Sequence, residues 1–147
     1  MTPLPRTGRL LALDWGEIRI GLAASDETQL LASPLQTVTR RAGKRYPMPA
    51  LLDLVTRNDI VGLLVGLPLT PEGEEGDSAR EARAMGELVA GRAGLPVEYW
   101  DERMTTARAL RSIQEQGGST RGRKEDVDAL AAAVLLQGYL DARRAAR

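Results

Sequence analysis

The chain has 147 residues, of which 20 are basic and 20 acidic, so its net charge at pH 7 is zero. This length predicts a single domain, residues 1–147, built around one hydrophobic core. The sequence contains no cysteine and no histidine, which excludes disulfides, iron–sulfur clusters, thiol catalysis and Ser-His-Asp catalysis. Any metal site must therefore use oxygen ligands, which favour magnesium or manganese.

Neither a membrane segment nor a signal peptide is expected. No segment approaches the roughly 20 apolar residues of a membrane span, and residues 1–9 lack the apolar core of a signal peptide. We therefore expect a cytoplasmic protein with no membrane partner. The neutral net charge argues against a strongly basic surface overall. Two local basic segments, 40–45 and 121–124, are the best electrostatic candidates for contact with nucleic acid, or are solvated loops.

The N-terminal part of the chain predicts three strands. Residues 10–15 form a short apolar run that contains an acid near its end, as a buried strand would. Residues 18–26 predict a second strand that follows closely enough to form a hairpin. Residues 30–40 alternate loosely between apolar and polar side chains and predict a third. We expect these strands to be antiparallel.

Helices and strands alternate in the middle of the chain. Residues 47–59 predict a helix that opens with two prolines, which suit a first helical turn. Residues 60–67 are almost entirely apolar, a pattern typical of a strand buried on both faces. Ser78 and Glu81 have the spacing of a capping box and predict the start of a helix that reaches about residue 94.

The C-terminal part predicts one more strand and two helices. The strand covers residues 95–100, the next helix runs to residue 116 from a threonine cap, and the last helix starts at residue 126. The resulting order favours an α/β fold with a five-stranded mixed sheet. Three antiparallel strands come first, two parallel strands follow, and helices cover both faces.

Four carboxylates stand where the predicted fold forms a site. Asp14 ends the first strand, Asp101 and Glu102 end the last strand, and Asp128 lies at the start of the last helix. The strand ends along one edge of an α/β sheet are the usual place for a site. Asp14 directly follows apolar residues, and burying an acid is costly unless it is paired or bound to metal. Two or three clustered carboxylates suit hard cations that support phosphodiester hydrolysis.

Each carboxylate also has a purely structural explanation. Asp128 favours the helix N-terminus through the helix dipole, and Asp101 and Glu102 can form a solvated turn. Because side chains alternate along a strand, Asp101 and Glu102 point to opposite faces. We favour Glu102 as the metal ligand, and the sequence leaves Asp101 open.

Glycine, arginine and threonine near these acids are candidates for contact with phosphate. Gly16 lets a backbone or a phosphate come close, and Arg19 follows it. Arg103, Thr105 and Thr106 come directly after the paired acids and can hold phosphate oxygens. Their structural explanations are a surface ion pair for Arg103 and a helix cap for the threonines. The second basic segment adds Arg121, Arg123 and Lys124.

Four segments together resemble the YqgF/RuvX family, whose members are described as Holliday junction resolvases or pre-16S rRNA nucleases. The segments occur in the family's order and cover nearly the whole chain. They are residues 13–26, 65–76, 101–107 and 124–140. One segment alone would be weak, whereas four in order are highly specific.

The resemblance implies an RNase H-like fold and a carboxylate site formed by Asp14, the Asp101–Glu102 pair and Asp128. It implies a bacterial endonuclease that uses Mg²⁺ or Mn²⁺ and acts on structured nucleic acid. Two substrates follow from the family: pre-16S rRNA, processed at its 5′ end during ribosome biogenesis, and branched DNA such as a Holliday junction. Ribosomal precursor particles are then expected partners, and a homodimer is open because resolvases act on two symmetric strands.

One feature departs from the wider RNase H-like class, and two alternative functions stay open. Such nucleases often place their second acid at the end of the central strand, but residues 60–67 end without one. The first alternative is a nucleic-acid or ribosome-associated binding module with weak or no nuclease activity, which the neutral charge and five aromatic residues keep open. The second is a phosphotransferase, disfavoured because the sequence holds no second copy of a phosphate loop like residues 14–21.

Overall fold

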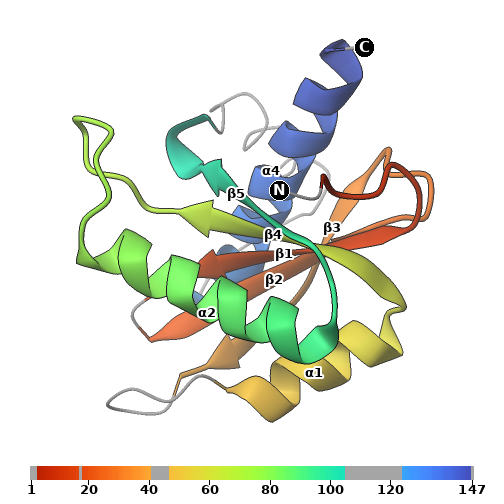
Figure 1. The fold of residues 1–147 in the computed structure, drawn as a ribbon, viewed down its shortest axis with the longest axis horizontal. Coiled ribbons are helices and arrows are strands. Elements are labelled where there is room, and N and C mark those ends of the chain that lie inside the picture. The colour runs from red at the N-terminus through yellow and green to blue at the C-terminus, as the bar shows by residue number, and fades with distance from the viewer. Residues whose placement is uncertain (1–2, 17, 41–46, 105–123, 147) are drawn as a thin grey trace.

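The computed structural model describes residues 3–16, 18–40, 47–104 and 124–146, and within these ranges the strands join in one sheet (Figure 1). Its strand order is β3-β2-β1-β4-β5. The strands are β1 (Arg9–Trp15), β2 (Arg19–Ser25), β3 (Ala32–Thr39), β4 (Ile60–Leu67) and β5 (Val97–Asp101). The helices are α1 (Met48–Arg57), α2 (Asp77–Ala93) and α4 (Lys124–Ala145), with a short 3₁₀ turn over Glu102–Met104.

The sheet is mixed, as the sequence predicts. β2 pairs antiparallel with both β1 and β3, while β4 joins β1 and β5 joins β4 in parallel. The β1–β2 hairpin closes tightly, with the amide of Gly16 donating to the carbonyl of Arg19 at 3.0 Å. A Cβ atom at Gly16 would lie 2.5 Å from that carbonyl oxygen, so this turn requires glycine.

Helices cover both faces of the sheet, which confirms the predicted layering. Helices α1 and α2 lie on one face and α4 on the other (Figure 1). Side-chain alternation divides the core accordingly: Leu11 and Leu13 pack toward α1 and α2, whereas Leu10 and Ala12 pack toward α4. In the described ranges, no helix has both the length and the apolar character needed to cross a membrane.

Two local predictions differ from the structure or fall outside it. The predicted capping box of Ser78 and Glu81 is wrong, because α2 begins after Gly76 with no side-chain cap. The Glu81 carboxylate instead accepts a hydrogen bond from the indole of Trp15 at 3.3 Å. The helix does end at Gly94, whose φ of 68° is left-handed and favours glycine. The helix predicted up to residue 116 lies outside the described residues.

Candidate functional site

Asp14 lies in β1 between two glycines. It pairs in register with Gly21 of β2 on one side and with Gly66 of β4 on the other. Paired residues in a sheet face the same side, and the neighbours of Asp14 on that side, Leu10 and Ala12, pack against α4. The Asp14 carboxylate therefore faces α4, near the edge of the sheet where β1 and β4 both end (Figure 1).

The missing side chains of these glycines determine what lies beside Asp14. A Cβ atom at Gly66 would lie 2.9 Å from Oε1 of Glu102, and one at Gly21 would lie 2.0 Å from the carbonyl oxygen of Asp128. The Glu102 carboxylate thus covers Gly66, and the start of α4 covers Gly21. Sequence reasoning missed the role of Gly21, although a glycine inside an apolar strand is a signal of close approach.

Asp14 and Glu102 form a partly buried carboxyl pair. Burial is the main cause that raises the pKa of Asp14 to about 9, followed by a hydrogen bond with Glu102 and the negative charges of Glu102 and Asp128. Oε1 of Glu102 is buried as well. With its pKa raised in this way, Asp14 keeps its proton at neutral pH unless a cation stabilises the carboxylate.

Asp128, the third predicted acid, lies close to this pair and forms an ion pair with Arg19. The Nε atom of Arg19 donates to Oδ2 of Asp128 at 2.6 Å, and their side chains are 26% and 35% exposed. Arg19 begins β2 directly after the hairpin turn. Among the residues that the structure describes, no three acidic side chains converge into a finished set of metal ligands.

Asp101 and Arg103 lie on the opposite face of the sheet. Tyr99 and Asp101 face the α2 side of β5, because the intervening Trp100 packs edge-on against Tyr139 of α4. Nη2 of Arg103 donates to Asp101 at 2.8 Å, and these hydrogen bonds lower the pKa of Asp101. The structure therefore places Glu102, and not Asp101, against Asp14.

The other residues predicted to contact phosphate or nucleic acid lie in several parts of the chain. Gly16 shapes the hairpin turn described above. Arg40 of the first basic segment is only 13% exposed; its guanidinium lies 3.9 Å from the ring centre of Trp15 and donates to the Gly16 carbonyl at 3.0 Å. Arg40 is therefore held by contacts within the protein and is not exposed for contact with nucleic acid. Lys124 begins α4, and its side chain is not described. The other predicted contacts lie outside the described residues: Thr105, Thr106, Arg121 and Arg123.

Comparison with solved structures defines the class of fold. RuvC of T. thermophilus in complex with a Holliday junction substrate superposes with a TM-score of 0.62 over 92% of this chain and 96% of that one. The sequence identity is 18%, so the likeness concerns the fold. The chain therefore has an RNase H-like fold of the RuvC type, which confirms the predicted fold class.

The chain belongs to the RuvX family. The family model, described as Holliday junction resolvase, matches residues 8–142. A relative from Anaeromyxobacter sp. (strain Fw109-5) is 44% identical over 137 residues, which cover 93% of this chain and 99% of the relative. Another from Koribacter versatilis (strain Ellin345) is 41% identical over 136 residues, 92% of this chain and 88% of the relative. Both relatives are named "Putative pre-16S rRNA nuclease".

Proposed function

We propose that this protein is a divalent-metal-dependent nuclease that hydrolyses phosphodiester bonds in structured nucleic acid. The observation that carries the proposal is the partly buried Asp14–Glu102 pair, with Asp128 close enough for its charge to raise the pKa of Asp14. Such a pair is costly to bury for stability alone, but it is what a site for a hard cation needs. Membership of the RuvX family supports the same activity.

Asp14, Glu102 and Asp128 would hold the ion, magnesium or manganese. The three side chains offer only oxygen donors, and the glycines beside Asp14 allow Glu102 and the start of α4 to come close to it. When bound, such an ion activates a water molecule and stabilises charge that develops on the phosphate. To serve as ligands, Asp14 would have to be ionised and Asp128 would have to turn from Arg19.

Arg19 has a second role in this proposal. Arg19, whose side chain is 26% exposed beside Asp128, would donate from its guanidinium to a phosphate oxygen at the edge of the site. Arg19 comes directly after the hairpin turn, which keeps it at this edge. Arg40 stabilises the turn by donating a hydrogen bond to the Gly16 carbonyl. Hydrolysis then breaks the bond between phosphorus and O3′, leaving a 5′ phosphate and a 3′ hydroxyl. Arg103, with Asp101, lies on the other face and is assigned no such contact.

The substrate we favour is the 5′ end of pre-16S rRNA. Relatives that match almost the whole chain at about 40% identity carry that activity in their names. This substrate places the protein in the cytoplasm, with ribosomal precursor particles as partners. The Holliday junction is the second candidate, because the family model is described by that activity.

A cleavage assay tests this proposal. Wild type, Asp14→Asn and Asp128→Asn are incubated with Mg²⁺ or Mn²⁺ and either precursor 16S RNA with its 5′ leader or a four-way DNA junction. Asp53→Asn is the matched control, because Asp53 is an exposed acid on α1. We expect cleavage of one substrate by wild type and the control, and none by the two site variants. Cleavage by both site variants would contradict the site, and metal binding without cleavage of either substrate would favour a binding module.

A further inference from the structure

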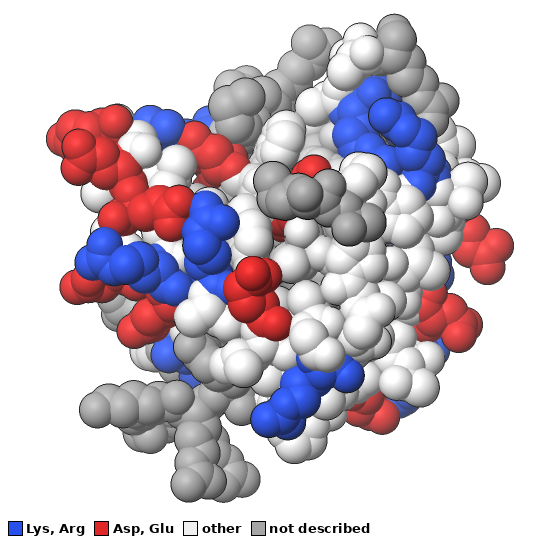
Figure 2. All heavy atoms as spheres, viewed as in Figure 1, with Lys and Arg blue, Asp and Glu red and all other residues white. Residues whose placement is uncertain are grey.

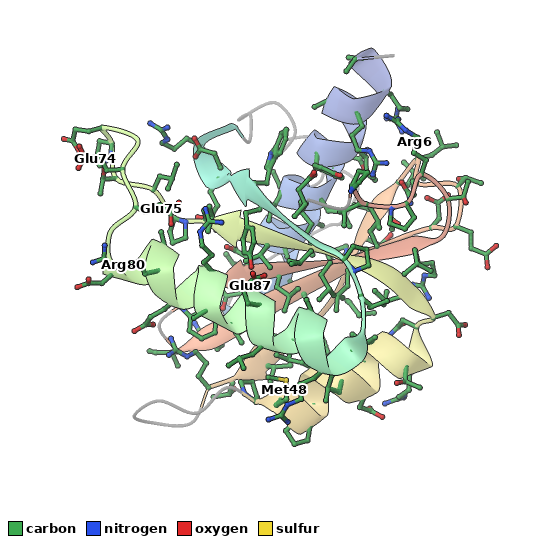
Figure 3. The ribbon with its side chains drawn as sticks, in the orientation of Figure 1. Arg6, Met48, Glu74, Glu75, Arg80 and Glu87 are labelled. Carbon is green, nitrogen blue, oxygen red and sulfur yellow. The ribbon has the colours of Figure 1, made fainter. Side chains whose placement is uncertain are left out.

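A basic pocket lies at the far end of α4 from the carboxylates. It is a hollow of about 90 Å³ whose wall includes Arg6, Thr28, Gln29, Leu30, Arg143 and Arg144. Arg6 is labelled in Figure 3, and Figure 2 shows basic side chains gathered on the same part of the surface. We call this hollow the distal pocket.

The distal pocket is separate from the carboxylate site. Asp128 lies near the start of α4, whereas Arg143 and Arg144 are in its last turn. At 1.5 Å of rise per residue, the two sites are roughly 20 Å apart along the helix axis. No residue of the wall belongs to the carboxylate site or to the phosphate contacts predicted from sequence.

The charge of the distal pocket is only partly balanced by the protein. None of its wall residues is acidic, and Arg144 pairs with Asp141 just outside it. Within the described ranges, neither Arg6 nor Arg143 forms an ion pair. Arg143 donates to the carbonyls of Leu4 and Pro5 at 3.1 and 3.2 Å, which orients its guanidinium without neutralising it. Guanidinium groups that share a hollow repel one another, so an anion between them is stabilising.

The wall is also held in place before anything binds. Gln29 has a left-handed φ of 58° and donates to the carbonyls of Pro5 and Gly8 at 3.0 and 2.9 Å. Nη1 of Arg144 donates to the carbonyls of Gln29 and Leu30 at 3.3 and 3.2 Å. These bonds join the N-terminal segment, the β2–β3 turn and α4. A site whose wall is already ordered loses little conformational entropy on binding.

We propose that the distal pocket binds a backbone phosphate of the nucleic acid that the carboxylate site acts on. The planar guanidinium group presents donors in the geometry of phosphate oxygens, and repeated phosphates in a strand reach a second site where a single anion does not. Roughly 20 Å corresponds to about six nucleotides at 3.4 Å per step, so the substrate must extend at least that far beyond the cleaved bond. This inference rests on the proposed function for the identity of the ligand.

Binding measurements with two charge-reversal variants test the inference. Arg6→Glu changes an exposed arginine of the distal pocket, and Arg92→Glu is its matched control, an exposed arginine in the last turn of α2 on the other face of the sheet. Fluorescence anisotropy follows a labelled RNA duplex and a DNA duplex in EDTA at several salt concentrations. We expect Arg6→Glu to weaken binding about tenfold, the value of one charge-assisted hydrogen bond, and to reduce the salt slope by about one. Arg92→Glu should leave both unchanged, and thermal unfolding checks that each variant is folded.

Each other result of the binding measurements contradicts the inference. Equal losses in the two variants would mean that only net charge matters, and unchanged binding by Arg6→Glu would remove the contact. In another result, the two variants bind the duplexes equally while inorganic phosphate or AMP raises the Tm of wild type but not of Arg6→Glu. This result would indicate a site for a small phosphate compound. If Arg6→Glu loses binding to polyglutamate while Arg92→Glu keeps it, and both bind the duplexes equally, the pocket takes an acidic protein partner. A protein that shows the expected binding but cleaves nothing would contradict the nuclease and leave the distal pocket supported.

Discussion

Replacing Asp14 by asparagine should stabilise the metal-free protein while it abolishes cleavage. Burial beside Glu102 raises the pKa of Asp14 from 3.8 to about 9. Between these two values the folded protein keeps a proton on Asp14 that the unfolded chain loses. The free energy of unfolding of the wild type must therefore fall as pH rises through this range. Asparagine resembles the protonated acid, donates a similar hydrogen bond to Glu102 and does not titrate.

The size of this effect follows from the pKa. One pH unit corresponds to 1.36 kcal/mol, so the interval from 3.8 to pH 7 sets an upper limit of about 4 kcal/mol. Relaxation and water entry around the partly exposed carboxyl lower the expected gain to about 2 to 4 kcal/mol at pH 7. For a chain of this length, that corresponds to a rise of roughly 5 to 10 °C in Tm.

Urea unfolding between pH 5 and pH 8 in EDTA measures the effect. The stability advantage of Asp14→Asn over wild type should be small at pH 5 and grow with each pH unit. Asp53→Asn, which changes an exposed acid on α1, should run parallel to the wild type. If the difference between Asp14→Asn and wild type is the same at every pH, the two carboxyls do not share a buried site and the reasoning fails.

Four further predictions concern the surroundings of the site. Gly66→Ala places a methyl group 2.8 Å from the buried Leu135 side chain and 2.9 Å from Oε1 of Glu102, so it should cost about 1 to 2 kcal/mol in stability and weaken Mg²⁺ binding at least about tenfold in calorimetry. Gly21→Ala meets the backbone of Asp128 at 2.0 Å, so it should lower the free energy of unfolding in urea by about 3 kcal/mol; a loss no larger than that of Gly66→Ala would contradict the close packing of α4. Mg²⁺ should raise the Tm of wild type, because an ion that binds only the folded state stabilises it. It should not raise the Tm of Asp128→Asn, which lacks one of the proposed ligands. Arg40→Ala removes the hydrogen bond to the hairpin turn and should cost about 1 to 2 kcal/mol, measured in urea against Arg92→Ala as the exposed control.

The sequence alone determined the order and type of the elements, because these depend on local patterns. The apolar run of residues 60–67 predicts β4 with its observed bounds, and the short link after residues 10–15 predicts the β1–β2 hairpin. Asp14 stood out for a local reason as well, as an acid directly after apolar residues. The four family segments are likewise stretches of contiguous sequence.

Only the tertiary structure decided which side chains meet. The register of β1 with both neighbours places Gly21 and Gly66 beside Asp14, and this arrangement brings Glu102 rather than Asp101 to it. The capping-box pattern at Glu81 was misleading because the folded chain uses that carboxylate for Trp15 of β1. The distal pocket is made by three segments far apart in the sequence. Register and packing arise from contacts between such distant segments, whereas the periodicity of one segment records only which of its faces is buried.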